Sequence, residues 1–208
     1  HLCLIFELAL FVDKKRGIKM KVIFAGGGTG GHLMVGLSTA EEICSRFHEA
    51  EIIFLGTGKK FEKRCVEQKG FQYQQLRAKK WGKSYKYIFT FIGTMLASIV
   101  ESLFVMRKFN PDIVVGLGGY VSVAPIVAAK LLCIPSVLLE QNVIPGKANR
   151  FLARWVDEVY CHWRGPIKWF NKAKVVRVTG MPIRKDILFS KRSRSAEKFG
   201  LSSSKKTI

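Results

Sequence analysis

The stretch Lys21–His32, which reads KVIFAGGGTGGH, decides the fold predicted for this chain of 208 residues. Val22–Ala25 is a short apolar run of the kind that forms a buried parallel strand. Glycines and one threonine follow directly, and the apolar periodicity of Leu33–Cys44 then predicts a helix. A strand, a glycine turn and a helix in this order direct backbone N–H groups and a helix N-terminus at an anion. The stretch therefore predicts an anion-binding turn, with a tight turn that holds no ligand as the alternative.

His32 closes this glycine turn and is the histidine best placed to act on a ligand held there. The ordinary pKa of a histidine lies near neutrality, which suits a general base. The alternative interpretation is a histidine that caps the helix that follows.

The charged residues are strongly unbalanced, because 35 Lys and Arg residues against 15 Asp and Glu residues give a formal net charge of +20. Such a charge favours an anionic partner, which can be nucleic acid, an anionic membrane surface or a phosphorylated substrate. A hydrophobic content of 48% is enough for a packed core and argues against a globally disordered chain.

The cysteines and histidines do not have the spacing of a metal site or of a disulfide scaffold. The cysteines are scattered and odd in number: Cys3, Cys44, Cys65, Cys133 and Cys161. The histidines also lack ligand spacing: His1, His32, His48 and His162. This pattern predicts no metal and fits a reducing cytosol.

Residues 1–19 precede the predicted domain. Residues 1–12 form an apolar stretch interrupted by Glu7, and lysines follow them, whereas a signal peptide carries its positive charges first. A membrane-spanning helix needs about 20 apolar residues, more than this run contains. Because Met20 directly precedes the first strand, we predict that residues 1–19 are an upstream extension. A short membrane-surface anchor is the competing interpretation.

Strands and helices alternate along residues 20–187 in the predicted secondary structure. The predicted strands are 22–25, 51–55, 71–76, 112–117, 135–139, 158–161 and 175–178, and the predicted helices are 33–47, 60–70, 87–105, 124–132 and 146–155. This alternation indicates βαβ units and an α/β fold with a Rossmann-like parallel sheet. Residues 188–208 are rich in Ser, Lys and Arg, and we expect them to be a linker to a further domain.

Three polar or glycine-rich loops follow predicted strands, and the carboxyl ends of parallel strands meet at one edge of a sheet. The loops are Gly26–His32, Gly118–Ser122 and Glu140–Asn142. Each is a weak signal alone, but together they predict a binding cleft. Glycines 26, 28 and 31 also match the dinucleotide fingerprint, which requires an acidic residue at the end of the second strand. Gly56-Thr57 stands there instead, so a nicotinamide cofactor is disfavoured.

The apolar segment 87–105 follows a basic stretch, RAKKWGKSYK, at residues 77–86. A helix that is apolar nearly all round is usually a core helix. Aromatic residues among cations suit an anionic membrane interface instead. The residues best placed for that interface are Lys79, Lys80, Trp81, Lys83, Tyr85, Lys86 and Ile88–Phe91. Both interpretations stay open, because one helix face can be buried while the other contacts lipid.

Four motifs, AGGGTGGH, VVGLGGYVSVAP, IPSVLLEQNVIPGKANR and VTGMPIRKDIL, occur in an order that resembles the MurG family of glycosyltransferases. The resemblance runs from Met20 to the C-terminus and implies the N-terminal, acceptor-binding half of a two-domain GT-B fold. The donor-binding domain would begin within residues 188–208. The implied enzyme is an inverting hexosyltransferase of peptidoglycan synthesis. It transfers N-acetylglucosamine from UDP-N-acetylglucosamine to the 4-hydroxyl of a lipid-linked N-acetylmuramyl-pentapeptide diphosphate, and this half alone would be inactive.

The same resemblance implies no cofactor, no metal and no nucleic-acid partner. It implies peripheral attachment to an anionic membrane at the cytoplasmic face of the inner membrane. The implied catalytic residues are His32, as the base, and Glu140. The implied substrate-binding residues are Gly28, Thr29, Gly30, Gly31, Gly118, Gly119, Tyr120, Asn142 and Arg184.

The sequence departs from the family pattern at three positions. Val35 stands where the family usually has proline, Leu139 stands where it has histidine, and Met181 stands where it has asparagine. The third glycine loop and the uridine-binding region of the second domain have no counterpart in the 208 residues. The competing hypothesis is a non-catalytic subunit that binds the acceptor or the membrane and is completed by a separate chain.

Overall fold

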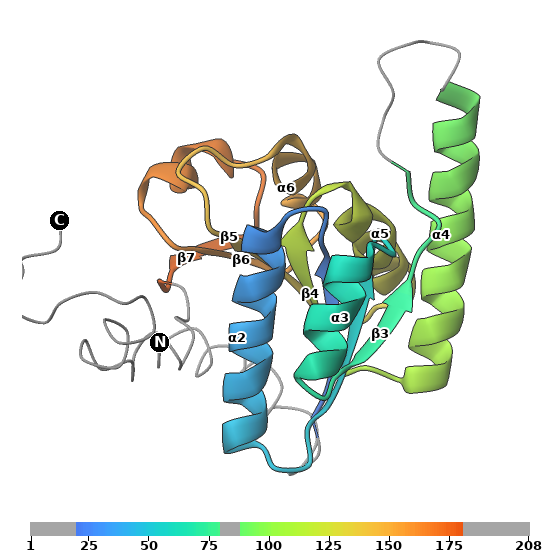
Figure 1. Cartoon of the computed structure of the whole chain (residues 1–208). Coiled ribbons are helices and arrows are strands. Elements are labelled where there is room, and N and C mark those ends of the chain that lie inside the picture. Colours follow the sequence, from blue (N-terminus) through green and yellow to red (C-terminus); the bar gives the residue numbers. More distant parts are fainter. Residues whose placement is uncertain (1–19, 80–87, 181–208) are drawn as a thin grey trace, which may run out of the picture.

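The computed structural model describes residues 20–79 and 88–180, and Figure 1 shows a sheet with helices on both faces. Seven strands form a parallel sheet in the order β3-β2-β1-β4-β5-β6-β7. The strands are β1 (Lys21–Gly26), β2 (Glu51–Gly56), β3 (Gln72–Gln75), β4 (Ile113–Gly118), β5 (Ser136–Glu140), β6 (Glu158–Cys161) and β7 (Val175–Val178). The predicted α/β fold with a Rossmann-like parallel sheet is therefore confirmed.

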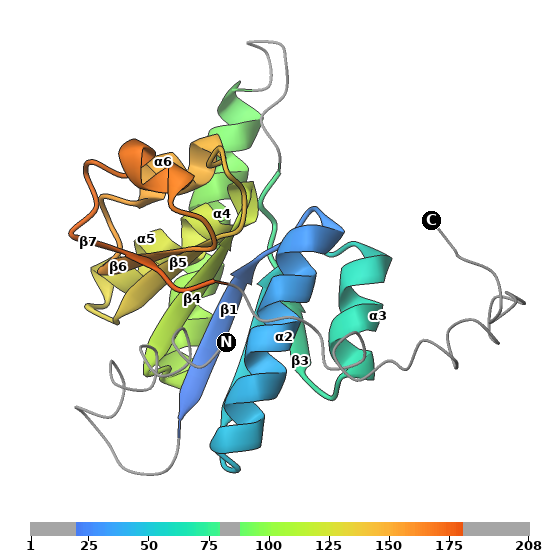
Figure 2. The ribbon, with the colours of Figure 1, turned by 90° about the vertical axis from the view of Figure 1, so that its left-hand side faces the viewer.

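The helices pack in two layers, one on each face of this sheet (Figures 1 and 2). The helices are α2 (Gly30–Arg46), α3 (Lys60–Gln68), α4 (Ile88–Phe109), α5 (Val123–Leu131) and α6 (Lys147–Leu152), with 3-10 turns η2 (Tyr120–Ser122) and η3 (Gly165–Trp169). Helices α2 and α3 cover one face, and α4 and α5 cover the other. The sheet therefore lies between two apolar cores.

The apolar run of strand β1 is continuous because both of its faces are buried. Val22 and Phe24 point into the core beneath α2, whereas Ile23 and Ala25 point into the core beneath α4 and α5. The Phe24 ring stacks on the Phe54 ring of β2, with 5.0 Å between the ring centroids. A strand that is covered on both faces has no polar face, so the period-two alternation of a half-exposed strand is absent.

The ends of three helices differ from the prediction by three residues or more. Helix α2 begins at Gly30 instead of residue 33, so two glycines and His32 form its first turn. Helix α4 continues to Phe109 and ends where Asn110 takes a positive φ of 53° before a proline. Helix α6 ends at Leu152, because the Trp155 N–H already bonds to the Leu152 carbonyl in a tighter turn. The 3-10 turns η2 and η3 were not predicted.

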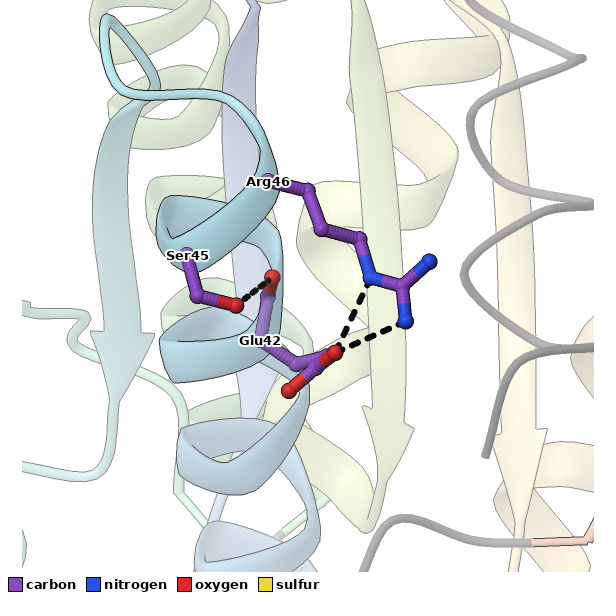
Figure 3. Close-up of polar contacts among 3 residues, drawn as sticks. All are labelled: Glu42, Ser45 and Arg46. Carbon is purple, nitrogen blue, oxygen red and sulfur yellow. Dashed lines mark hydrogen bonds and ion pairs between the residues drawn. The ribbon is translucent and has the colours of Figure 1, made fainter.

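The C-terminal turn of α2 carries an exposed polar cluster (Figure 3). Arg46 pairs with the Glu42 carboxylate one turn earlier at 2.9 Å, and the Ser45 hydroxyl donates to the Glu42 carbonyl at 2.8 Å. A cation in the last turn also complements the helix dipole. An exposed pair of this spacing contributes about 0.3–0.5 kcal/mol, so the buried face of α2 is what holds the helix on the sheet.

The order of the strands places a topological switch point between β1 and β4, where the binding crevice of an open α/β sheet is expected. These two strands are neighbours, but the chain leaves β1 toward β2 and leaves β4 toward β5. The loops at their carboxyl ends therefore diverge, and in open α/β sheets such a switch point is where ligands bind. The upstream extension at 1–19, the linker at 188–208, Arg184 and the basic residues 80–86 lie outside the described residues, and the predictions about them stay predictions.

Candidate active site

The glycine loop after β1 has a backbone that requires glycine. Gly26, Gly27 and Gly28 have φ values of 152°, 153° and 88°. The pairing of β1 with β4 shifts by one residue here, so that Gly26 lies opposite Gly118. A Cβ at Gly26 would lie only 2.7 Å from the Leu117 Cβ. The glycines thus allow β1 and β4 to approach closely at the crevice.

The second glycine turn touches the first. Gly119 has a φ of 81°, and a Cβ there would lie 3.0 Å from the Gly27 carbonyl oxygen. The Tyr120 ring lies next to Gly28, where a Cβ would be 4.0 Å from the ring. Burial, and then the charge of Glu62, raises the pKa of the Tyr120 hydroxyl. The two predicted loops are therefore brought together.

His32 lies in the first turn of α2 with its imidazole against Gly118. A Cβ at Gly118, which has a φ of 101°, would lie 2.9 Å from His32 Cδ2 and 3.0 Å from His32 Nε2. His32 Nδ1 forms a hydrogen bond with the Thr29 hydroxyl, and Thr29 is the residue that precedes the helix. This bond fixes the ring, and only glycine at position 118 leaves room for it.

The environment of His32 keeps the imidazole neutral. Partial burial lowers the pKa of His32, and the negative charge of Glu140 partly opposes that shift. A lowered pKa means that the unprotonated form prevails at neutral pH. A neutral imidazole can accept a proton, which a histidinium cannot.

Glu140 ends β5 and is 1% exposed. One carboxylate oxygen accepts the Asn142 backbone N–H at 2.8 Å and the Asn142 Nδ2 at 2.9 Å. The other accepts Asn149 Nδ2 at 2.9 Å. Both oxygens therefore have partners within the protein, and the carboxylate acts on His32 through its charge. The catalytic role implied for Glu140 stays a prediction.

Asn149 of α6 is a site residue that the sequence analysis missed. It is 2% exposed, and a Cβ at Gly118 would lie 3.2 Å from its Nδ2, on the same side as His32. Within the described part of the chain its Oδ1 has no hydrogen-bond partner. The signal in the sequence was an asparagine close behind the Glu140–Asn142 loop, which alone is typical of many helices.

Glu62 of α3 is the second residue that was missed. It is 2% exposed, and its carboxylate accepts the Gly28 N–H at 2.6 Å. The same carboxylate accepts the backbone N–H and the hydroxyl of Thr57, each at 2.8 Å, and the Tyr73 hydroxyl at 3.0 Å. The Gly28 amide, expected to face a ligand, is therefore occupied by a side chain of the protein itself.

The surface at the crevice offers backbone donors and one amide side chain. Thr29, Gly30 and Gly31 are exposed at the N-terminus of α2, and Asn142 is exposed beyond β5. Among the free N–H groups of a helix N-terminus, those of glycine are the least shielded by side chains. In residues 20–79 and 88–180, no group of three His, Cys, Asp or Glu residues could hold a metal ion.

Sequence comparison relates the chain to known glycosyltransferases. Residues 22–161 match the family model described as the glycosyltransferase family 28 N-terminal domain. A protein of Thermodesulfovibrio yellowstonii is 37% identical over 190 residues, which cover 91% of this chain and 52% of that protein. A protein of Syntrophus aciditrophicus is 39% identical over 79% of this chain and 46% of its own length. Both are named UDP-N-acetylglucosamine--N-acetylmuramyl-(pentapeptide) pyrophosphoryl-undecaprenol N-acetylglucosamine transferase.

Structure comparison agrees with the sequence comparison. The crystal structure of Acinetobacter baumannii MurG aligns with a TM-score of 0.63 and 26% sequence identity, over 80% of this chain and 46% of that chain. The resemblance to the MurG family drawn from the four motifs is therefore confirmed. The chain spans about half the length of the curated relatives that it matches.

Proposed function

Since this chain belongs to glycosyltransferase family 28 and carries its N-terminal domain, we propose that it is the acceptor-binding half of an inverting N-acetylglucosaminyltransferase of the MurG type. The observation that carries the proposal is the neutral His32 imidazole, held against Gly118 in the crevice between β1 and β4. Supporting it, each loop predicted to form a cleft acts on this imidazole: Thr29 bonds to it, Gly118 lies against it and Glu140 acts on it by charge. The names of the relatives supply the substrates to be tested.

The proposed reaction uses His32 as the general base. The imidazole accepts the proton of the muramyl 4-hydroxyl, and the hydroxyl oxygen forms a bond to the anomeric carbon of UDP-N-acetylglucosamine. The bond from that carbon to the UDP oxygen breaks, and UDP leaves with the bonding electrons. Because the hydroxyl attacks opposite the leaving group, the anomeric configuration inverts. Proton transfer to a positioned base typically contributes about 10²- to 10⁴-fold in rate.

We propose that Thr29 and the Glu140–Asn149 pair hold this base in place. The Thr29 hydroxyl bonds to Nδ1, which leaves Nε2 toward Gly118 and free for the proton. Glu140 bonds to Asn142 and Asn149 and supplies negative charge that stabilises the imidazolium formed in the reaction. The buried Asn149 Oδ1 has no hydrogen-bond partner among the described residues, so a hydroxyl group of the acceptor substrate is the expected donor to it.

The exposed glycines at the start of α2, together with Gly118-Gly119-Tyr120, are proposed to hold the acceptor diphosphate. A helix N-terminus carries partial positive charge and free N–H groups, so it binds phosphate groups without a metal. Thr29, Gly30 and Gly31 are also proposed to contact the sugar nucleotide held by a second domain. UDP-N-acetylglucosamine as the donor is supported by the names of the curated relatives.

Helix α4 is proposed to attach this half to the cytoplasmic face of an anionic membrane. It is the helix in the described part of the chain that is long and apolar enough to span a membrane, and only 11% of its apolar window is buried. An exposed apolar stripe follows helical spacing: Phe89, Ile92, Leu96, Val100 and Phe104. The N-terminal end of α4 projects beyond the sheet (Figures 1 and 2).

The opposite face of α4 argues for peripheral attachment. Ser98, Ser102, Val105 and Met106 of that face are buried against the domain. A spanning helix would have to leave this packing. Aromatic side chains near lysines such as Lys79 suit the interfacial zone of a membrane.

The test of the catalytic proposal uses a version of the protein that also carries the donor domain. We expect His32→Ala to lower the rate of N-acetylglucosamine transfer to the lipid-linked acceptor by about 10²-fold or more. Asn142→Ala should raise the KM for the acceptor. His48→Ala is the matched control, since His48 is an exposed histidine outside the crevice. Near-normal transfer by both site variants would overturn the assigned roles.

A further inference from the structure

The carboxylate of Glu62 fills the concave side of the glycine loop. A Cβ at Gly27 would lie 2.8 Å from Glu62 Oε1, and a Cβ at Gly56 would lie 2.9 Å from Glu62 Oε2. A side chain at either glycine, one after β1 and one ending β2, would therefore collide with this carboxylate. Glu62 itself comes from α3, so that one side chain joins three elements of the fold.

The hydrogen-bond donors around Glu62 require an acceptor at both of its oxygens. Oε1 accepts the Gly28 N–H, and Oε2 accepts the Thr57 N–H together with the Thr57 and Tyr73 hydroxyls. A glutamine in either orientation would turn its NH₂ group against one of the two backbone N–H groups. Burial raises the pKa of the Tyr73 hydroxyl, so the phenol keeps the proton that it donates. Only a carboxylate satisfies this set.

We propose that the Glu62 carboxylate occupies the anion-binding position of the glycine loop. It holds the loop in its binding shape and keeps the Gly28 N–H from bonding to the phosphates of the ligand. Loops of this kind bind phosphate because successive N–H groups converge on one anion. Here a side chain of the protein takes that position, buried and with four hydrogen bonds. Lys59 Nζ completes the loop by donating to the Gly28 carbonyl at 2.9 Å.

The consequence concerns which hydrogen-bond donors of the protein bind the diphosphate of the acceptor substrate. With Gly28 closed, the N–H groups left for a diphosphate are those of the exposed Gly30 and Gly31 and of the half-buried Gly119 and Tyr120. Glu62 is thus a positioning residue, which acts on the ligand through the loop. This inference rests on the proposed function in one respect, namely that the ligand is a diphosphate.

The experiment is chemical rescue by acetate. Glu62→Ala removes the carboxylate and leaves a space that acetate can fill with the same acceptor atoms. We expect binding of a short-prenyl muramyl-pentapeptide diphosphate to this chain, followed by calorimetry, to weaken about tenfold in Glu62→Ala. Sodium acetate at about 50 mM should restore most of that loss. Sodium chloride at the same ionic strength should not.

Two variants make the rescue specific. Glu67→Ala removes an exposed carboxylate from the same helix and should bind the diphosphate like the parent in both salts. Glu62→Gln fills the space with an amide, so acetate should have no effect on it. Glu62→Ala that binds the diphosphate within twofold of the parent, or that responds equally to acetate and chloride, would overturn the proposal.

Two further readouts keep the outcome decisive. Amide hydrogen exchange at Gly28 and Thr57 should become faster in Glu62→Ala and slow again in acetate, whether or not the chain binds a diphosphate. If the parent binds no diphosphate, the proposed function fails while this exchange still tests the role of Glu62. If Glu62→Ala does not fold, Tyr73→Phe removes a single donor to the same carboxylate. About threefold weaker binding with faster Gly28 exchange would then support the proposal, and no change in either would refute it.

Discussion

At the scale of single residues, the ionisation of His32 is the property on which the proposed chemistry depends. Burial lowers its pKa below the ordinary value of 6.5, and Glu140 limits the decrease. Removing the Glu140 charge should therefore lower the pKa further. We expect the His32 ring signal in an NMR titration of this chain to change below pH 6.5, and at still lower pH in Glu140→Gln. A His32 that titrates above pH 6.5 would contradict the proposed role.

Because His32 packs against Gly118, replacing Gly118 by alanine should destabilise the fold. Two contributions to this loss can be separated: backbone strain and the steric contact with the imidazole. Gly118→Ala combines a positive φ with a Cβ 2.9 Å from the imidazole, whereas Gly70 has a φ of 79° and no atom within 4 Å of its Cβ position. Gly70→Ala should therefore cost only backbone strain, about 1 kcal/mol. Gly118→Ala should cost about 3 kcal/mol, measured by urea unfolding, because the contact adds to the strain. Equal losses would show that the imidazole is not confined by Gly118.

The site residues that were predicted differ in one physical respect from Glu62, which was not. Those that the structure describes lie at the end of a strand, in the loop after it or in the first turn that follows, where the rule for parallel sheets assigns them to one edge. Glu62 acts on Gly28 across 34 residues of chain, and its neighbours in KFEKRCVEQ give the helix a charged appearance. A signal existed, because Glu62 is one turn before the buried Val66 and so lies on the inward face of α3. A glutamate on that face needs donors, and sequence alone does not identify them.

At the scale of elements, helix α4 has an exposed apolar face, which we predict to contact membrane lipid. Phe89 is 82% exposed and Leu96 is 59% exposed. Replacing Phe89 and Ile92 by serine should weaken binding to anionic vesicles by on the order of a hundredfold, because each side chain contributes about 1.5 kcal/mol when buried in an apolar phase. Vesicle sedimentation measures the change. Phe61→Ser is the control, since Phe61 is an exposed phenylalanine on α3. Unchanged sedimentation of the double variant would exclude this face.

The basic residues before α4 give a second, electrostatic test of the same surface. Each Lys near an anionic leaflet contributes about 1 kcal/mol before screening. Changing Lys79, Lys80, Lys83 and Lys86 to glutamate should therefore release the protein from anionic vesicles and leave its circular dichroism spectrum unchanged. Binding by the parent should be weak on neutral vesicles and should decrease with salt, because charges are screened beyond about 10 Å at 0.1 M. Sedimentation of the variant at the parent level would assign the membrane contact to another face.

The existence of the elements was predictable from sequence, whereas several of their ends were not. Strands β6 and β7 match the predicted bounds, because each is an apolar run with clear breaks on both sides. The start of α2 was placed too late, since glycine is a poor helix former and Gly30 and Gly31 gave no periodic signal. Packing of the following turns on β1 overrides that propensity. The short turns η2 and η3 depend on local bonds such as Ser122 N–H to the Gly119 carbonyl, which have no periodicity to detect.

At the scale of the whole molecule, the strand order brings the separate motifs together. Periodicity along the chain does not predict which strands are neighbours, but the parallel βαβ pattern already required the loops after β1, β4 and β5 to share one edge. The net charge of +20 indicated an anionic partner without selecting one. The fold limits the choice, because the exposed donors gather at the crevice while the apolar stripe lies on α4. A diphosphate and a lipid surface are thus expected at different places on the same domain.

This domain differs from a dinucleotide-binding one of similar topology in the way it uses its acidic residue. A dinucleotide site needs a carboxylate at the end of β2 for the ribose hydroxyls, and Glu62 does bring a carboxylate next to Thr57 at that position. Its oxygens, however, accept four hydrogen bonds from the protein, and the residue is 2% exposed. No Glu62 oxygen is therefore available to accept a hydrogen bond from a ribose hydroxyl. The Gly28 N–H is not available to a pyrophosphate, because it already bonds to Glu62.

We expect 1 mM NAD or NADP to leave the unfolding midpoint of this chain unchanged in a thermal-shift titration. A ligand with a dissociation constant of about 100 μM would add about 1.4 kcal/mol at that concentration, which the method resolves. The short-prenyl muramyl-pentapeptide diphosphate should raise the midpoint under the same conditions, and Gly30→Val, which crowds the exposed amides at the start of α2, should remove that increase. A shift with either nicotinamide cofactor, sensitive to Gly30→Val and absent with the diphosphate, would reverse the assignment of the crevice.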